Sequence, residues 1–144
     1  MNIKEITVND KFYNDTIELR TNVISIPFGF PPPKKEKETA DSHFFVATDD
    51  NGKVVGFAMI TPSADKTSIR ARQVSVLPEL QRKGIGHLLM AAAEQKAAEL
   101  GYSELRLFAH SGSHPFFLKL DYEVKGDWQT QENGLQTIFM VKKI

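Results

Sequence analysis

Residues 72–89 decide the fold of this chain, and they read RQVSVLPELQRKGIGHLL. Up to Val76 the stretch carries β-branched residues typical of a strand, and Pro78, which has no amide hydrogen, ends ordinary strand pairing. From Ile85 onward the apolar residues recur on one helical stripe, and Gly101 follows as a stop signal. A strand, a tight turn and a long helix are therefore predicted in direct succession.

The turn at residues 81–86 has the composition of an anion-binding site. It contains two cations, Arg82 and Lys83, and two glycines, Gly84 and Gly86. The first amides of a helix have no intrahelical acceptor and the helix dipole is positive there, while glycine lets the backbone approach phosphate oxygens closely. We interpret the turn as a phosphate-binding site, with plain turn geometry as the alternative. Neither a P-loop nor a dinucleotide-binding glycine pattern is present.

Outside this stretch, the hydrophobic periods predict one sheet flanked by helices. Strands are expected at residues 2–8, 43–48, 53–60, 68–77, 105–109, 122–125 and 137–141, and helices at 10–26, 85–100 and 113–120. In strand 68–77, alternation predicts Ile69, Ala71 and Gln73 on one face and Arg70, Arg72, Val74 and Val76 on the other. The expected fold class is α/β (α+β), with a mixed, mostly antiparallel, sheet of six or seven strands. This sheet is expected to split near Val76 and Ala109.

The segment 27–41 contains four prolines and no apolar period, so we expect a loop, with the preceding helix ending before Pro27. Phe28 and Phe30 suggest a lid over an acceptor pocket, and a plain connector is the alternative. The acidic residues of the loop are Glu36, Glu38 and Asp41. If the loop covers the site, these carboxylates favour a cationic acceptor.

Composition restricts the class of protein. A chain of 144 residues with 41% hydrophobic and 25% charged residues is expected to form a single domain, residues 1–144. Lysine and arginine total 18, as do aspartate and glutamate, so the net charge is zero. The chain therefore has no overall positive electrostatic field that would attract nucleic acid or an anionic membrane. Without cysteine there is no disulfide or thiolate site. No signal-like or membrane-spanning run occurs, so a cytoplasmic location is expected. A homodimer is compatible with these properties.

The stretch 72–89 resembles the acetyl-CoA motif of the GNAT superfamily of N-acetyltransferases. In that family, a strand with Val-x-Val precedes a loop and then Gln/Arg-x-x-Gly-x-Gly/Ala at the start of a helix. A second stretch, PFFLKLDY at residues 115–122, resembles the later Phe-Tyr-x-x-x-Gly-Phe segment of the family. The two motifs organise residues 68–125, and the N-terminal third shares only the order of elements.

The resemblance implies transfer of an acetyl group from acetyl-CoA, as co-substrate, to a primary amine of a small molecule or peptide by direct attack. The cofactor-binding residues that it implies are Val74, Ser75, Val76, Gln81, Arg82, Lys83, Gly84, Ile85, Gly86, His87 and Phe117. The backbone from Val74 to Val76 would pair with the pantetheine amides, and an N–H near Val76 would polarise the thioester carbonyl. The pyrophosphate would contact the amides of residues 82–87.

Two departures from the family pattern concern the chemistry. Phe117 stands where the family usually has a tyrosine that protonates the departing thiolate, and Asp121 stands where it usually has glycine. Phenylalanine cannot donate a proton, which leaves Tyr122 and Tyr102 as candidate acids. The alternative function is therefore a catalytically weak or inactive CoA-binding sensor or interaction module on the same fold.

His110, directly after the strand 105–109, is the candidate catalytic base, at a place where the family often has a polar residue. The alternative for His110 is an ordinary hydrogen-bonded histidine at a strand end. His114 lies four residues further on, but Ser111, Gly112 and Ser113 disfavour a helix between the two, and no acidic third ligand is nearby. We therefore expect no metal site.

Overall fold

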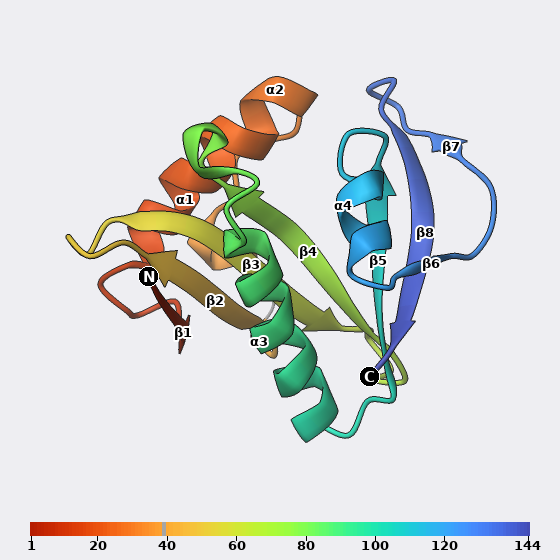
Figure 1. Cartoon of the computed structure of the whole chain (residues 1–144), viewed down its shortest axis with the longest axis horizontal. Helices are drawn as coiled ribbons and strands as arrows, with labels where there is room; N and C mark the ends of the chain where they lie inside the picture. Colours follow the sequence, from red (N-terminus) through yellow and green to blue (C-terminus); the bar gives the residue numbers. More distant parts are fainter. Residues whose placement is uncertain (39) are drawn as a thin grey trace.

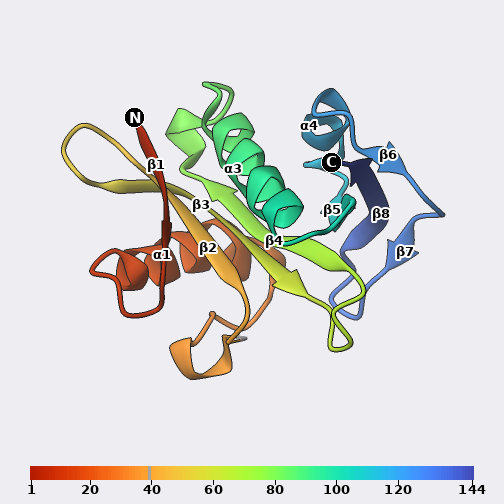
Figure 2. The ribbon, with the colours of Figure 1, turned by 90° about the horizontal axis from the view of Figure 1, so that it is seen from below.

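The computed structural model describes residues 1–38 and 40–144, which form one eight-stranded sheet with helices on both faces (Figures 1 and 2). The strands are β1 (Asn2–Ile6), β2 (His43–Thr48), β3 (Val54–Pro62), β4 (Ile69–Val76), β5 (Glu104–His110), β6 (Glu123–Val124), β7 (Gln129–Thr130) and β8 (Gln136–Lys143). The α-helices are α1 (Tyr13–Arg20), α2 (Ile26–Phe28), α3 (Ile85–Glu99) and α4 (His114–Lys119). Short helical segments are η1 (Thr21–Ser25), η2 (Lys35–Lys37) and η3 (Pro78–Leu80).

The strand order is β1-β2-β3-β4-β5-β8-β6, and β7 pairs with β8. Every strand pair is antiparallel except β4 with β5, so the predicted mixed, mostly antiparallel sheet is confirmed. Eight strands are present where six or seven were predicted. The two-residue β7, between Lys125 and Gln136, is too short and polar to produce a periodic signal.

Two hydrophobic cores lie on opposite faces of the sheet. The larger one packs α3 and α4 against the sheet through residues such as Leu89, Ala93 and Phe117. The smaller one packs α1 against β2 and β3 through residues such as Tyr13 and Phe57. Figure 2 shows α1 beneath the β2–β3 part of the sheet and α3 above it. On the α1 side, no helix among the described residues covers β5 and β8.

The sheet splits between β4 and β5. These two strands are paired at one position only, Arg70 with Arg106, and they diverge from there toward Val76 and His110 (Figure 1). The split lies where the sequence predicted it, near Val76 and Ala109. Parallel strands held at one position leave the rest of each facing edge with unpaired backbone groups.

A β-bulge interrupts β4 along the split, three residues after Arg70. Met59 pairs with Arg72 and Phe57 with Ser75, so Ala58 alone faces both Gln73 and Val74. Gln73 adopts a φ of 53°, unusual for a residue other than glycine.

The predicted alternation along β4 is wrong beyond Arg72, because the extra residue reverses which face each later side chain occupies. Val74 and Val76 pack into the same core as Ile69 and Ala71, while Gln73 faces α1.

Arg20 ties α1 to this bulge. Its side chain is fully buried, and its Nη1 donates to Glu38 Oε1 at 2.7 Å and to Gln73 Oε1 at 3.0 Å. Its Nη2 donates to Thr16 Oγ1 at 3.0 Å, and its guanidinium lies 4.2 Å from the ring centre of Phe57. One buried cation thus holds a helix, a loop and the bulged strand together.

The first helical region continues past Pro27, so the prediction that it ends before this proline is wrong. The segment η1 is a π-helix, in which Ile26 N–H bonds to the carbonyl of Thr21, five residues back. Proline removes only one donor in such a turn, and α2 ends at Gly29, whose φ is 75°. Phe28 therefore lies at the end of a helix rather than in a loop.

Replacing Arg20 by alanine should lower the free energy of unfolding by about 3–5 kcal/mol, because the Glu38 carboxylate, whose side chain is only 10% exposed, loses its cation. The double variant Arg20→Met/Glu38→Leu should recover much of this loss, since it removes both charges and keeps the volume. Urea denaturation of the three proteins measures the difference. Equal losses in the single and double variants would contradict a buried ion pair as the cause.

Candidate functional site

The turn between β4 and α3 is held by backbone geometry and one side chain. Gln81 Nε2 donates to the carbonyl of Val76 at 3.1 Å, which fixes the end of β4 to the turn. Arg82 has a φ of 66°, and Gly84, with a φ of 87°, precedes the first residue of α3. The positive φ at Gly84 is the conformation that glycine adopts without strain.

The start of α3 presents free amides. The first bond of the helical ladder runs from Leu88 N–H to the carbonyl of Gly84, at 3.1 Å. The amides of Ile85, Gly86 and His87 precede it and have no intrahelical acceptor. Arg82 and Lys83 are exposed beside them, and neither forms an ion pair with the described residues. The arrangement combines backbone donors, a positive dipole end and two exposed cations.

The end of β4 offers a donor to the split. Leu77 N–H donates to the carbonyl of Val55 at 3.0 Å, on the β3 side. Alternation of the strand then directs the N–H of Val76 to the opposite edge, toward β5. The carbonyl of Val76 is already engaged by Gln81. Ser75 is buried and its Oγ donates to the carbonyl of Gln73 at 3.0 Å, so this hydroxyl has an intramolecular partner.

The start of α3 packs closely on α4. A β-carbon at Gly86 would lie 2.8 Å from Phe116 Cζ, a distance that only glycine avoids. Phe116 packs edge-on against Phe117, with 4.9 Å between ring centres. Phe117 is buried and packs in turn against Tyr122. The aromatic ring at the family's tyrosine position is therefore part of the core that supports the turn.

The two tyrosines considered as acids are both poorly placed. Tyr122 is buried, its hydroxyl donates to Glu94 Oε2 at 2.7 Å, and burial together with Glu94 raises its pKa. Lys142 Nζ holds the other oxygen of Glu94 at 2.9 Å. Tyr102 follows the C-terminal end of α3, roughly 20 Å from the anion-binding turn at a rise of about 1.5 Å per residue.

His110 lies at the end of β5 with one ring nitrogen engaged. The amide of Gly112 donates to His110 Nδ1 at 3.0 Å, and burial lowers the pKa of His110. A backbone N–H can only donate, so the neutral ring carries its proton on Nε2. In this state His110 is a hydrogen-bond donor through Nε2. It can accept a proton on Nδ1 only if the hydrogen bond from Gly112 is broken.

A contact across the split was not predicted from the sequence. The ring of Phe28 packs 4.7 Å from that of His110, and Asn133 Nδ2 donates to the carbonyl of Phe28 at 2.7 Å. The end of α2 and the β7–β8 connection thus meet at the open end of the split (Figure 1). No local sequence pattern reveals this hydrogen bond, because Asn133 and Phe28 are 105 residues apart.

The acetyltransferase (GNAT) domain family matches residues 40–124, more than half of the chain, including the turn and the split. The chain belongs to the GNAT family. Streptothricin acetyltransferase of Streptomyces lavendulae is 39% identical over 72 residues, which are 50% of this chain and 38% of that protein. The chain therefore matches well under half the length of this relative.

Solved structures share the GNAT fold over nearly the whole chain. An aminoglycoside 6'-N-acetyltransferase complexed with coenzyme A has a TM-score of 0.81 at 18% identity, covering 99% of this chain and 97% of that one. The phosphinothricin acetyltransferase of Sinorhizobium meliloti, in complex with acetyl-CoA, has a TM-score of 0.76 at 19% identity and covers 99% and 88%. At these identities the similarity establishes the fold.

For two of the three acidic loop residues, the structure gives no support to the cationic-acceptor site suggested by the sequence, and for Asp41 that site stays a prediction. The carboxylate of Glu38 is occupied by Arg20 and by the hydroxyl of Tyr13, at 2.7 and 2.8 Å. Glu36 is exposed on η2.

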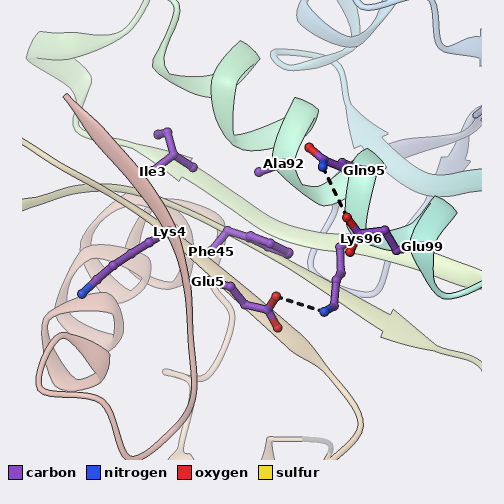
Figure 3. A pocket seen from close by; sticks show the side chains of 8 residues that line it. All are labelled: Ile3, Lys4, Glu5, Phe45, Ala92, Gln95, Lys96 and Glu99. Atoms are coloured by element: carbon purple, nitrogen blue, oxygen red, sulfur yellow. Dashed lines mark hydrogen bonds and ion pairs between the residues drawn. The ribbon is translucent and has the colours of Figure 1, made fainter.

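A separate groove of about 180 Å³ lies between β1 and α3 (Figure 3). There, Glu5 pairs with Lys96 at 3.3 Å and with His43 at 2.9 Å, so its carboxylate already has partners. Within residues 1–38 and 40–144, no cluster of three or more His, Cys, Asp or Glu could hold a metal, and no helix is long and apolar enough to cross a membrane.

An NMR titration of the four histidines should show His110 as the Nε2–H tautomer, with a midpoint below the ordinary value of 6.5. The reason is that Gly112 N–H occupies Nδ1 and burial disfavours the charged ring. Long-range ¹H–¹⁵N correlation spectra report both quantities, with His110→Asn for assignment. An Nδ1–H tautomer, or a midpoint above 6.5, would contradict this geometry.

Proposed function

We propose that this GNAT domain transfers an acetyl group from acetyl-CoA to a primary amine by direct attack, without a covalent enzyme intermediate. The observation that carries the proposal is the juxtaposition of two features. The free amides at the start of α3 lie directly after the open edge of β4, which bears the N–H of Val76. A phosphate site next to an unpaired strand edge fits a ligand that has a pyrophosphate and an amide-containing arm.

The residues fit such a cofactor. The amides of residues 85–87 and the side chains of Arg82 and Lys83 would hold the pyrophosphate. Backbone groups of Val74 would pair with the pantetheine amides, while Val76 would contribute its N–H to the thioester end of the cofactor. Gln81 would act indirectly by holding the end of β4. Gly84, Ile85 and Gly86 shape the turn, and Phe117 supports it from α4 through Phe116.

Acetyl-CoA supplies an acetyl group already activated as a thioester. The Val76 N–H would donate to the carbonyl oxygen as charge develops on it. The bond that forms joins the amine nitrogen to the acetyl carbon, the carbon–sulfur bond breaks, and a proton from the amine leaves to solvent or to sulfur. A thiol pKa of about 8.5 makes the thiolate a tolerable leaving group near neutral pH, so Phe117 in place of tyrosine is compatible with turnover.

His110 we assign to the acceptor side of the reaction. It lies at the end of β5 facing Phe28, at the mouth of the split, and its Nε2–H would donate to a polar group of the acceptor. The amine would then lose its proton to water, or would bind in its neutral form. The 39%-identical relative named streptothricin acetyltransferase supports a small-molecule acceptor over a peptide.

The experiment is a thiol-release assay with acetyl-CoA and a panel of amines, together with calorimetry of acetyl-CoA binding. Free CoA should appear only when an amine is present, in equal amount to the acetylated product. The variant Lys83→Ala should weaken acetyl-CoA binding by about threefold to tenfold, because one phosphate countercharge is lost. Lys143→Ala, opposite Glu104 at the closed end of the split, removes an equivalent charge and is the control.

Each failure of this experiment has a distinct meaning. Tight acetyl-CoA binding with no release on any amine would contradict the enzyme and support the CoA-binding module instead. Failure to bind CoA, with preference for ATP or a dinucleotide, would contradict both functions.

A further inference from the structure

One face of the split sheet concentrates cations and aromatic rings. Strand pairing puts Arg70 of β4 beside Arg106 of β5. Arg106, Phe108 and His110 are every second residue of β5 and therefore lie on the same side of this strand. Phe108 pairs with Phe139 of β8, and their ring centres are 5.2 Å apart. This is the side of the sheet that α1 occupies at β2 and β3 and that no described helix covers at β5 and β8 (Figure 2).

Two of these cations lack an acidic partner. Arg106 is neutralised by Glu104 of its own strand, at 2.9 Å. Arg70 and Arg72 form no ion pair and no side-chain hydrogen bond with the residues that the structure describes. Burial and the charge of Arg72 lower the pKa of Arg70.

Arg72 shares the face of Arg70, because Arg72 pairs with Met59 and Arg70 with Thr61, two residues apart on β3. The two guanidinium groups therefore lie on one surface without countercharge.

The aromatic rings orient these cations. The guanidinium of Arg70 lies 5.5 Å from the ring centre of Phe108, and that of Arg106 lies 6.0 Å from that of Phe139. A guanidinium over a ring keeps its N–H edge free for a carboxylate or phosphate. Phe108 is 50% exposed, an unusual exposure for a large apolar side chain in a sheet. We call the five residues Arg70, Arg72, Arg106, Phe108 and Phe139 the arginine face.

The arginine face lies on the side of the sheet away from the phosphate site, with Arg72 four residues before Val76 on β4. The anion-binding turn begins α3, and α3 packs on the opposite face of the sheet. A cofactor bound at that turn with its arm in the split would present its acyl end toward the face that carries Arg72 and His110. An amine would approach from that side. This step rests on the proposed function.

We propose that the acceptor amine carries an anionic group on an apolar body, and that Arg70 and Arg72 bind the anion while Phe108 and Phe139 contact the apolar part. Carboxylate and phosphate share this chemistry. Glu104 pairs with Arg106 and Glu38 pairs with Arg20, so neither carboxylate serves as the partner of Arg70 or Arg72. Phe28, packed on His110, bounds the face at the open end of the split.

The test compares amines that differ only in a group remote from the nitrogen. The carboxylate probe is 4-(2-aminoethyl)benzoate against 4-(2-aminoethyl)benzamide, and the phosphate probe is tyramine phosphate against tyramine. At least one anionic probe should exceed its neutral partner by about tenfold or more in kcat/KM. The probe pair that shows the preference identifies the anion.

The variants Arg70→Gln and Arg72→Gln should each remove most of this preference by raising KM for the anionic amine, with little change for its neutral partner. Lys143→Gln removes one charge at the far end of the same face, opposite Glu104, and should preserve the preference. Equal turnover of the paired amines, preference for the neutral member, or equal effects of all three variants would overturn the inference. Any of these results with amine-dependent CoA release would leave the proposed function standing, whereas absence of acetyl-CoA binding would contradict the proposed function itself.

Discussion

The structure depends on the limited backbone pairing between β4 and β5. They pair at Arg70 and Arg106 alone, and the remaining edge of each strand faces the other without hydrogen bonds between them. An open parallel edge inside a sheet is costly unless another group pairs with it. The elements that surround the split therefore either hold it apart or bear groups that a ligand can use. The placement of Val76, of the turn at Gly84 and of His110 follows from this separation.

Two features shape β4 beside the split, namely its bulge and the bond from the buried Arg20 to Gln73. The extra residue at Gln73 turns the strand and moves Val74 and Val76 onto the α3 face. Arg20 fixes Gln73 from the other face through one hydrogen bond. The same bulge leaves Arg72 on the α1 face, beside Arg70. One irregularity in the strand thus separates the phosphate-binding face from the arginine face.

Much of this could be predicted from residues with local signals. The glycines of the turn and the helical stripe after Ile85 determine backbone conformation within a few residues, and the predicted elements follow them closely. The bulge at Gln73 could not be predicted, because the residue is unusual only in its φ. Nor could the occupation of Glu38 by Arg20, since both appear in sequence as ordinary charged side chains. The same holds for the cluster of Phe28, His110 and Asn133, because these residues come from distant segments that meet only in the folded chain.

The central claim is that the backbone of the β4–α3 segment forms the cofactor site. Residue-resolved amide hydrogen exchange with and without acetyl-CoA tests it most directly. The account predicts slower exchange at Val76, Gly86 and His87 on binding, and little change at Leu77, whose amide is already bonded to Val55. Unchanged exchange at these three amides under saturating acetyl-CoA, or protection confined to a different part of the chain, would contradict it.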